Sequence, residues 1–589
     1  MERRGISRSF IAMADVTRHT EAWQDKPWHH FHRVVFRLQK RIYQASQRGD
    51  RRTVHKLQRL LLSSSAARHL AVRRVTQDNQ GKRTAGIDGR ASLKPHERLQ
   101  LVQDLKDFEG EAMPLRRTSI PKPGTAERRP LGIPTMDNRA RHALVKLALE
   151  PEWEAKFEPN SYGFRPGRST HDAIGAIFLS IKHTPKYVLD TDIEKCFDRI
   201  DHTYLLAKLQ TFPRLRRLIK RWLKAGILDG EVFIPSTAGT PQGSPASPLL
   251  ANIALHGLEE DLHRSLPHRK HGLDWRPTVI RYADDMVILH RDAETLQALR
   301  TRTETWLQRV GLQLKPSKTR IAHTLERTHA QVGFDFLGFT VRQYPVSPHR
   351  SGKNGVGQRL GFKTLIRPSK TAQRRHLQRT GALIRRHRGT HQDQLITALG
   401  PVITGWSRYY AHVASKTTFT QMYHRVHHQL RRWARWRHPH KGYRWRMARY
   451  WHRHQGTLVF GQTRLLPRHP ETPITRHAKV AGRRSPFDGD WTYWGKRLRH
   501  YTGLSPLKGK LLTAQEGRCH QCRLYFTSED QTEVHHKDGN RSNNRLPNLT
   551  LLHRHCHDAV HGTHDKSHRI EKLHDRKRSR AVLQRQEVE

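Results

Sequence analysis

Asp284 and Asp285 are adjacent carboxylates with the residue types of a divalent metal site. They lie between two β-prone runs, residues 278–281 and 286–289, which predicts a hairpin with both carboxylates at its tip. Aspartate is unfavourable in strands, and a divalent cation would neutralise this local negative charge, because Mg²⁺ prefers carboxylates, waters and phosphate oxygens. An Asp-Asp pair also occurs in ordinary turns, so the interpretation depends on further acidic residues.

A second acidic segment, residues 187–193, also has the composition of a strand. The alternation of side chains along a strand would direct Asp190 and Asp192 to the same face. Two-metal phosphoryl transfer uses carboxylates that hold two ions about 4 Å apart, one activating a hydroxyl and the other stabilising the leaving group. Asp192 and Asp284 together have the residue types for this chemistry.

Three of the four cysteines lie close together near the end of the sequence, which suggests a metal site. Cys519-x-x-Cys522 is followed by His553-x-x-Cys556, a four-ligand set with the long central loop of a closed tetrahedral Zn²⁺ site. His555 is an alternative third ligand, since imidazole is a normal zinc ligand at either position.

A group of histidines surrounds this zinc motif. His535 and His536 lie inside the loop before Asn548, and His557 and His561 follow it. The arrangement resembles the HNH endonuclease motif. On that match His536 is the general base, Asn548 orients the hairpin, and His535, His557 and His561 bind a catalytic Mg²⁺ or Mn²⁺. The alternatives are a second structural zinc site or simple enrichment, because the chain contains 43 histidines.

The formal net charge of +56 is far beyond what solubility requires. It indicates a polyanionic partner, with nucleic acid the leading candidate. We find no apolar run of membrane-spanning length, no lipidation motif and no signal peptide, so we expect neither a membrane protein nor a secreted one. The expected location is the cytoplasm or nucleoid of a bacterium or an organellar matrix, where clustered cysteines bind metal in a reducing environment.

Three stretches of the sequence would position these residues. Residues 31–62 predict a basic helical pair broken at Gly49-Asp50, with an outer face that is either solvated or in contact with RNA. Residues 81–339 alternate turns, apolar runs and helical stretches, as an α/β core does. Residues 367–450 predict helices with an apolar stripe opposite a basic face, and their tryptophans either pack in the core or contact RNA.

Seven blocks occur in a fixed order along the middle of the chain. They resemble the successive reverse transcriptase blocks of group II intron-encoded proteins. The blocks are 117–134 (RTSIPKPGTAERRPLGIP), 161–170 (SYGFRPGRST), 192–198 (DIEKCFD), 239–252 (GTPQGSPASPLLAN), 282–285 (YADD), 311–320 (GLQLKPSKTR) and 333–339 (GFDFLGF).

The resemblance implies a catalytic acidic set of Asp192, Asp284 and Asp285, with Asp192 and Asp284 as Mg²⁺ ligands. It favours Asp192 over Asp190, because the aromatic residue that excludes the 2′-hydroxyl of an incoming nucleotide is matched by Phe197. Asp190 and Asp198 are then structural.

The same resemblance implies a nucleotide-binding set. Lys122 and Arg129 match basic fingers residues that grip the triphosphate, with Arg128 as a substitute for Arg129. Gln242 would lie against template or nucleotide, and Lys318 resembles a palm lysine near the nucleotide. Simple turn or salt-bridge roles remain open for these last two residues.

The expected architecture is a multidomain α+β protein with a right-hand polymerase, an antiparallel sheet in its fingers and palm, an α-helical thumb and a small zinc-stabilised ββα HNH module. The expected divisions are a basic helical N-terminal extension (1–80), fingers and palm (81–360), a helical thumb or maturase domain (361–460), a DNA-binding segment or linker (461–508), an HNH endonuclease (509–575) and a basic tail (576–589).

The resemblance implies a sequence of activities. The protein would bind its intron RNA, assist splicing and remain with the lariat, which would reverse-splice into double-stranded target DNA. The HNH module would nick the opposite strand, and the polymerase would copy the intron from dNTPs. Two alternatives are a splicing cofactor with an idle polymerase, and a host-defence or repair reverse transcriptase fused to a nuclease. Residues 405–410 (GWSRYY), which resemble the maturase region, favour the intron hypothesis over the second alternative.

Overall fold

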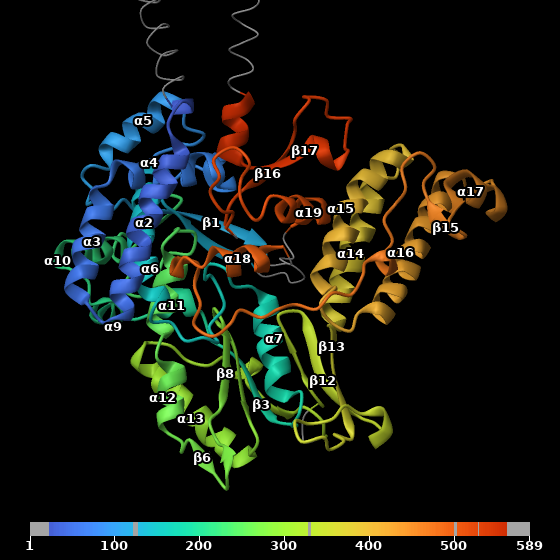
Figure 1. Ribbon diagram of the computed structural model, residues 1–589, viewed down its shortest axis with the longest axis horizontal. Coiled ribbons are helices and arrows are strands. Elements are labelled where there is room, and N and C mark those ends of the chain that lie inside the picture. The colour runs from blue at the N-terminus through green and yellow to red at the C-terminus, as the bar shows by residue number, and fades with distance from the viewer. Residues whose placement is uncertain (1–22, 122–127, 328–330, 500–503, 528, 562–589) are drawn as a thin grey trace, which may run out of the picture.

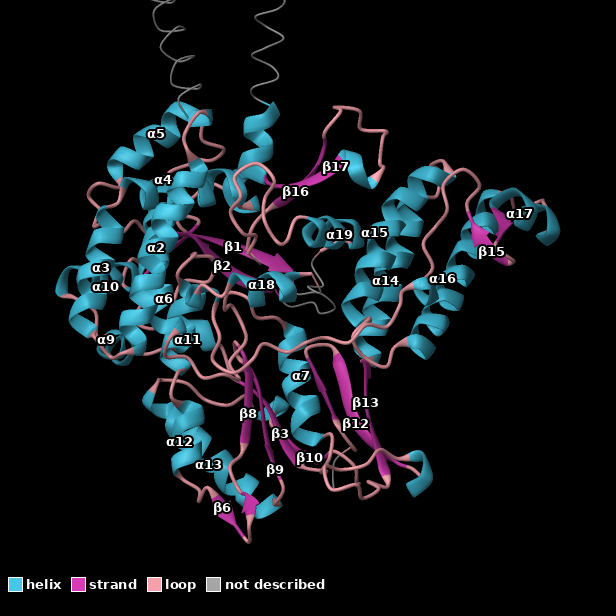
Figure 2. Cartoon of the chain, in the orientation of Figure 1, coloured by secondary structure: helices cyan, strands magenta, loops and turns pink. Residues whose placement is uncertain are grey.

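The computed structural model describes residues 23–121, 128–327, 331–499, 504–527 and 529–561. Figure 1 shows N-terminal helices on one side, a strand-rich body below and a group of helices on the other side. The last described segment lies above the centre, beside the N-terminal helices. Figure 2 shows that the strands form separate small sheets embedded among helices. The expected multidomain α+β class is confirmed.

The N-terminal helices form the first part of the main hydrophobic core. The expected basic helical pair is confirmed, because one helix ends before Gly49, which has a φ of +74°, and the Asp50 side chain caps the next helix by accepting from the Thr53 amide. The elements are α2 (Trp28–Gln47), α3 (Arg51–Ser63), α4 (Ser65–Arg73), η1 (Arg74–Asp78), η2 (Gln80–Arg83), α5 (Pro95–Asp104) and α6 (Met136–Glu154).

A four-stranded sheet with the order β2-β1-β4-β5 follows. β1 and β2 are antiparallel neighbours, and β4 pairs with β1 in parallel. Its strands are β1 (Leu115–Pro121), β2 (Arg128–Ile133), β4 (Ile227–Asp229) and β5 (Val232–Ile234). Lys122, one of the expected nucleotide-binding residues, lies outside the described residues, in the connection between β1 and β2.

The central sheet has the order β10-β3-β9-β8, and all neighbouring strands are antiparallel. Side chains that alternate along the strands are buried in two different hydrophobic cores. Leu189 and Ile288 belong to the main core on one face of the sheet, and Val188 and Val287 belong to a second core on the other face. Both faces are therefore covered, so the register of each strand is strongly specified. The strands are β3 (Tyr187–Asp192), β8 (Thr278–Tyr282), β9 (Asp285–His290) and β10 (Arg320–His323).

Helices and short elements surround this sheet. They are α7 (Thr170–Ile181), α8 (Cys196–Arg199), α9 (His202–Leu209), α10 (Pro213–Leu223), α11 (Ser247–Leu255), α12 (Leu258–Arg264), β6 (Arg269–Lys270), β7 (Leu273–Asp274), α13 (Ala293–Arg309) and η3 (Pro316–Lys318).

A three-stranded sheet connects this body to the second helical group. The elements are β11 (Phe334–Phe336), β12 (Phe339–Pro345), η4 (Pro348–Arg350), β13 (Phe362–Pro368), α14 (Lys370–Arg386), α15 (Gln392–Tyr410), α16 (Lys416–Arg437), α17 (Tyr443–Tyr450), β14 (Trp451–His454) and β15 (Thr457–Phe460). The expected apolar stripe is confirmed on α16, where Phe419, Met422, Val426, Leu430 and Trp433 are buried. Of the tryptophans that follow, Trp436 and Trp445 are exposed and Trp451 is buried.

The chain then returns along the central body through η5 (His469–Glu471), η6 (Pro486–Asp488) and α18 (Trp491–Leu498). Asp172 of α7 holds this returning segment. Its carboxylate accepts from Arg497 at 2.6 Å on both oxygens and from the Val480 amide at 2.8 Å, and His477 Nε2 lies 3.1 Å away. Residues 477–497 are therefore packed against α7 and are not a free linker.

The last described segment has a small hydrophobic core of its own, which includes Leu512, Phe526 and Leu551. Its elements are α19 (Pro506–Ala514), β16 (Thr532–His536), η7 (Leu546–Asn548) and β17 (Leu549–His553), followed by helical residues 554–561. Among all the described residues, we find no helix with the length and apolar character needed to cross a membrane.

Candidate metal centres

The three carboxylates expected to act together meet at one end of the central sheet. β3 and β9 pair so that Asp192 lies opposite Asp285, and the β8–β9 turn places Asp284 immediately before Asp285. Ala283 adopts a left-handed backbone with a φ of +59°, and the Ile193 amide donates to the Asp284 carbonyl at 3.2 Å. Register and turn therefore bring together residues from two distant segments of the chain.

The electrostatics of this acidic cluster favour a bound cation. Burial raises the pKa of Asp284, and the neighbouring charge of Asp192 adds to this effect. Burial, followed by the charges of Asp284 and Asp192, raises the pKa of Asp285 to about 7. Carboxylates that repel one another in a partly buried site are the oxygen ligands that fit Mg²⁺, whose charge would relieve the repulsion.

Basic side chains lie next to the acidic cluster. Lys318 of η3 places Nζ 2.6 Å from Asp192 Oδ2. Arg320, two residues later, donates twice to Asp190 Oδ2, at 3.0 and 2.9 Å. Asp190 is thus held in an ion pair away from the turn, whereas Lys318 is in direct contact with the cluster.

Phe197 and Gln242 lie on two neighbouring segments, residues 197–198 and 240–242, that are hydrogen-bonded to each other. The Phe197 carbonyl accepts from the Thr240 amide, and its ring meets exposed Phe164 edge to face at a centroid distance of 6.1 Å. The Gln242 side chain donates to Asp198 Oδ1 at 3.3 Å, and its carbonyl accepts from Gly132 of β2. These contacts connect the central body to the β1–β2 sheet.

Arg128 and Arg129 begin strand β2, and both side chains are exposed. Arg129 pairs in register with Ile120, and Arg128 Nη2 lies 3.4 Å from the Ser119 carbonyl. Arg129 is near enough to the acidic cluster for its charge to lower the pKa of Asp284, against the dominant effect of burial.

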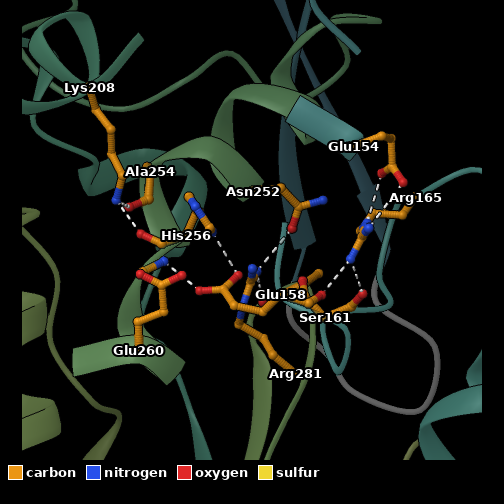
Figure 3. Close-up of polar contacts among 12 residues, drawn as sticks. Glu154, Glu158, Ser161, Arg165, Lys208, Asn252, Ala254, His256, Glu260 and Arg281 are labelled. Atoms are coloured by element: carbon orange, nitrogen blue, oxygen red, sulfur yellow. Dashed lines mark hydrogen bonds and ion pairs between the residues drawn. The ribbon is translucent and has the colours of Figure 1, made fainter. Parts of the chain in front are cut away.

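A buried polar network contacts the acidic turn, and Figure 3 shows Arg281, Asn252 and Glu158 as members of this network. Arg281, which is 4% exposed, donates from Nη1 to Asn252 Oδ1 at 2.9 Å and to the Ala283 carbonyl at 3.3 Å. Asn252 donates in turn to the Gly163 carbonyl at 2.8 Å. A side chain at Gly163 would collide with the Ala283 backbone, because its Cβ would lie 2.4 Å from the Ala283 nitrogen.

Buried acids accompany this network. Glu158 Oε2 lies 2.9 Å from His256 Nδ1. Although burial opposes ionisation, the hydrogen bond and charge of His256 hold the pKa of Glu158 at about 2, and the charge of Arg281 also lowers it. Arg165 and Glu154 form a second buried ion pair at 2.8 Å.

Arg281, Asn252 and Gly163 were not among the functional residues predicted from the sequence. The available signal was a charged residue at the end of the apolar strand that leads into Asp284. We infer that Arg281 positions the turn through the Ala283 carbonyl.

Arg281→Lys should lower nucleotide incorporation about tenfold or more. Lysine is one bond shorter than arginine, so its ammonium cannot occupy the position from which Nη1 donates to both Asn252 and the Ala283 carbonyl. The loss of hydrogen bonds to a buried charge should also lower the free energy of unfolding by about 1–3 kcal/mol. Steady-state incorporation at several Mg²⁺ concentrations and thermal unfolding measure the two effects. Arg276→Lys, at an exposed position before the same strand, is the control and should change neither.

Asp285→Asn should stabilise the metal-free protein at neutral pH. The folded-state pKa of Asp285 is raised to about 7 from an ordinary value of 3.8. The wild-type side chain therefore contributes stability below pH 4 that is lost as the pH rises towards 7, since the unfolded state releases its proton first. Unfolding without metal should show a difference between variant and wild type that grows from pH 4 to 7, and Mg²⁺ should reduce it. A difference independent of pH would contradict the assignment.

The Cys and His residues expected to bind zinc converge at the base of the β16–β17 hairpin. One potential ligand atom from each of Cys519, Cys522, His553 and Cys556 lies within 4.8 Å of the other three. Cys522 Sγ is 3.4 Å from His553 Nδ1, and the other ring nitrogen of His553 lies 3.4 Å from Asp530 Oδ2. A thiolate-rich set with a carboxylate behind the imidazole fits Zn²⁺. The geometry groups His553 with the cysteines, whereas His555 stacks on the outer face of the His553 ring.

A second histidine cluster lies on the same hairpin and the helical residues after it. His535, His557 and His561 also place ligand atoms within 4.8 Å of one another. His557 Nδ1 is 3.1 Å from Glu533 Oε2, a contact that orients its ring. Three imidazoles at half-buried and exposed positions fit a divalent ion that remains open to a ligand.

His536 and Asn548 lie at the two ends of the loop that joins β16 to β17. His536 Nε2 lies 3.2 Å from Asn544 Oδ1, at the half-buried end of β16. Asn548 closes the loop between β16 and β17, because it donates to Asp538 Oδ1 at 2.9 Å and to the Asn543 carbonyl at 2.8 Å. Its own oxygen accepts from the Asp538 amide at 3.1 Å. Asn548 thus holds the loop that follows His536.

Comparisons with known proteins give three family matches. Residues 23–105 match the N-terminal domain of reverse transcriptase, residues 120–341 match reverse transcriptase (RNA-dependent DNA polymerase), and residues 373–451 match the group II intron, maturase-specific domain. The matched ranges end before the two Cys/His clusters.

Individual relatives agree with these matches. The chain is 31% identical over 321 residues to protein YkfC of Escherichia coli, covering 48% of this chain and 82% of YkfC. It is 38% identical over 187 residues to the group II intron-encoded protein LtrA of Lactococcus lactis, but this covers only 31% of each chain. It is 27% identical over 331 residues to maturase-like protein 1 of Euglena gracilis, covering 54% of this chain and 65% of the relative.

Proposed function

The chain belongs to the family of group II intron reverse transcriptases and maturases, and from this we propose that it also nicks target DNA and supports retrohoming of its intron. The family membership implies RNA-directed DNA synthesis and binding of intron RNA. The observation that carries the proposal is the presence, in one chain, of the acidic cluster at Asp192 and Asp284 and of a histidine cluster built on a zinc-type hairpin.

In the proposed polymerase centre, Asp192 and Asp284 would hold Mg²⁺, and Asp285 completes the acidic set. The metal would supply positive charge for activation of the primer 3′-hydroxyl and for the leaving pyrophosphate. The hydroxyl oxygen attacks the α-phosphorus of a dNTP and loses its proton to solvent, and the bond to pyrophosphate breaks. Arg129, with Lys122, orients the triphosphate, and Lys318 next to Asp192 adds positive charge near the nucleotide.

Phe197 and Gln242 have proposed roles in selecting and holding the nucleotide. The Phe197 ring packs edge to face against Phe164, so its position is restrained where a ribose 2′-hydroxyl would be excluded. Gln242 is tied to the β1–β2 sheet through its carbonyl and to Asp198 through its side chain. A nucleotide held between these elements would contact both.

In the proposed nuclease centre, His536 removes a proton from water, and the resulting hydroxide attacks a DNA phosphorus. The bond to the 3′-oxygen breaks, the leaving oxygen takes a proton from solvent, and a 3′-hydroxyl remains for primer extension. His535, His557 and His561 would hold a divalent ion, which would supply positive charge next to the phosphate. Asn548 keeps the loop after His536 in place. Cys519, Cys522, His553 and Cys556 hold Zn²⁺, which replaces the larger hydrophobic core that so small a module lacks.

Recognition of the intron RNA is assigned to the helices from α14 to α17. The sequence between Asp393 and Glu471 contains no acidic residue. Exposed Trp436 and Trp445 each carry a cation over the ring, Arg388 at 5.1 Å and Lys441 at 5.5 Å. Such surfaces bind phosphates by charge and unpaired bases by stacking.

The proposed function can be tested by purifying the protein from cells that express it with or without the intron RNA. We expect the protein to recover the spliced lariat, to accelerate splicing at low Mg²⁺ concentration, and to synthesise cDNA from a nicked DNA target. Splicing without any cDNA synthesis would instead identify a cofactor with an idle polymerase. Synthesis without recovery of a long structured RNA would identify a defence or repair enzyme.

A further inference from the structure

The module that carries both Cys/His clusters contacts the N-terminal helices through polar side chains. Arg74 Nη2 of η1 lies 3.0 Å from Glu529 Oε2. The Gln531 side chain donates to the carbonyl of Asp78, at the end of the same element. We call this pair of contacts, Arg74–Glu529 and Gln531–Asp78, the docking seam.

Aromatic rings extend the contact beyond the docking seam. His32 of α2 stacks on His555 at a centroid distance of 5.0 Å and an interplanar angle of 18°. Trp491 of α18 packs against Phe36 of α2 at 4.7 Å and stacks in parallel on Tyr525 of the module at 5.5 Å. Three segments distant in sequence therefore meet at one place, as the adjacent N-terminal and C-terminal ribbons in Figure 1 show.

The interface combines polar and aromatic contacts and is incompletely filled. A cavity of about 830 Å³ lies between the N-terminal helices and the module, with Arg33, Phe36, Lys146 and Tyr525 among its lining residues. The side chains of Arg74 and Glu529 remain 51% and 36% exposed. Such half-exposed ion pairs contribute little stability, and interfaces between the domains of one chain usually allow relative motion.

We propose that the docking seam holds the nuclease module in one orientation relative to the polymerase, and so sets the position of the DNA nick relative to the polymerase centre. This inference rests on the proposed nuclease function. A covalent connection alone leaves the orientation of a domain open, whereas the docking seam adds directional contacts at a second place. The half-exposed Arg74–Glu529 pair contributes little to stability, so we assign it a role in orientation.

A charge-swap experiment tests the seam at positions where substitution is tolerated. Arg74→Glu and Glu529→Arg each replace the ion pair by a like-charge pair, and the double variant restores an ion pair with reversed sign. Arg73 is unsuitable, because its side chain is 5% exposed and lies over the Trp28 ring. Arg52→Glu, at an exposed position on α3, makes the same charge change away from the module and is the matched control.

Hydrogen exchange of the full chain measures docking without nuclease activity. Peptides covering residues 65–78 and 529–536 should exchange faster in each single variant and return to the wild-type rate in the double variant. Two results would overturn the docking seam. One is an exchange rate in both single variants equal to that of the wild type, and the other is a double variant whose peptides exchange as fast as those of the single variants.

Nicking of target DNA by the protein bound to its intron RNA measures whether the docking seam sets the position of the nick. Each single variant should spread the nick over several positions and lower cDNA primed at the nick about tenfold, since misplacement of reacting groups is costly. Extension of a primer already annealed to RNA should not change, and the double variant should restore a single nick. If the single variants nick the target at the same position as the wild type, the positioning role is overturned. A wild-type protein that does not nick at all refutes the nuclease function and with it the positioning role, and the exchange data then decide the docking seam alone.

Discussion

Asp284→Asn should reduce nucleotide incorporation roughly 1000-fold, which corresponds to about 4 kcal/mol of lost transition-state stabilisation. The asparagine keeps the size of the side chain but removes a negative charge from the acidic cluster, where Asp192 and Asp285 also lie. With one carboxylate fewer, Mg²⁺ binds weakly and cannot activate the primer hydroxyl. Single-nucleotide extension of a DNA primer on an RNA template, with Mg²⁺ varied, measures the loss.

Asp190→Asn is the matched control for this experiment. Asp190 lies on the same strand, but Arg320 occupies its carboxylate at 2.9 Å. Partly exposed ion pairs contribute about 0.2–1 kcal/mol, so the control should retain most of the activity. Equal losses in both variants would contradict the assignment of Asp284 as a metal ligand. Retained RNA binding by Asp284→Asn would show that the variant is folded.

His536→Ala should abolish second-strand nicking while DNA synthesis on an annealed primer continues. The expected decrease is about 100- to 10,000-fold, the usual contribution of general acid–base catalysis. His536 is half-buried at the end of β16, and among the described residues its side chain has a hydrogen-bond contact only with Asn544. The alanine keeps the backbone of the strand, so the substitution should not disturb the hairpin. Cleavage of end-labelled target DNA by the protein with its intron RNA measures the nick.

His520→Ala is the matched control for His536→Ala. It removes a histidine from the same module without removing the assigned base. His520 lies between two zinc-type cysteines but is exposed. It should therefore leave nicking within about twofold of wild type, given that exposed substitutions usually have small effects. Loss of both nicking and DNA synthesis in His536→Ala would indicate a role in folding and would contradict the assignment as a base.

The two expected losses should be independent of each other. Asp284 lies in the central sheet, whereas His536 lies in a module with a separate hydrophobic core. An Asp284→Asn protein should therefore still nick the target, and a His536→Ala protein should still extend a primer supplied in place of the nick. Adding such a primer should restore cDNA synthesis only in the second variant.

Local patterns in the sequence were enough to predict much of this molecule. The break between α2 and α3 could be predicted because Gly49 and Asp50 act on their immediate neighbours. The hairpin at Asp284 and the buried stripe of α16 likewise follow from residue periodicity. The ordered blocks and the maturase-type helices indicated the family that the comparisons support. The roles assigned to individual site residues stay predictions.

Distant contacts account for what the sequence could not provide. Asp192 and Asp190 are equivalent by alternation, and only the pairing of β3 with β9 and β10 places one beside Asp285 and the other beside Arg320. The sequence predicted His553 as the third zinc ligand and left His555 as an alternative. The fold of the hairpin groups His553 with the three cysteines.

Asp284 and Asp285 were recognisable from the sequence alone as a pair of carboxylates at a turn, because strand propensity and turn formation depend on adjacent residues. The tertiary structure decided what surrounds that turn. It placed Asp192 opposite Asp285, joined Arg281 to both Asn252 and the Ala283 carbonyl, and set the histidine-bearing module against the N-terminal helices. Burial, strand register and ion pairing depend on which distant segments meet, and that information is not present in any local stretch of sequence.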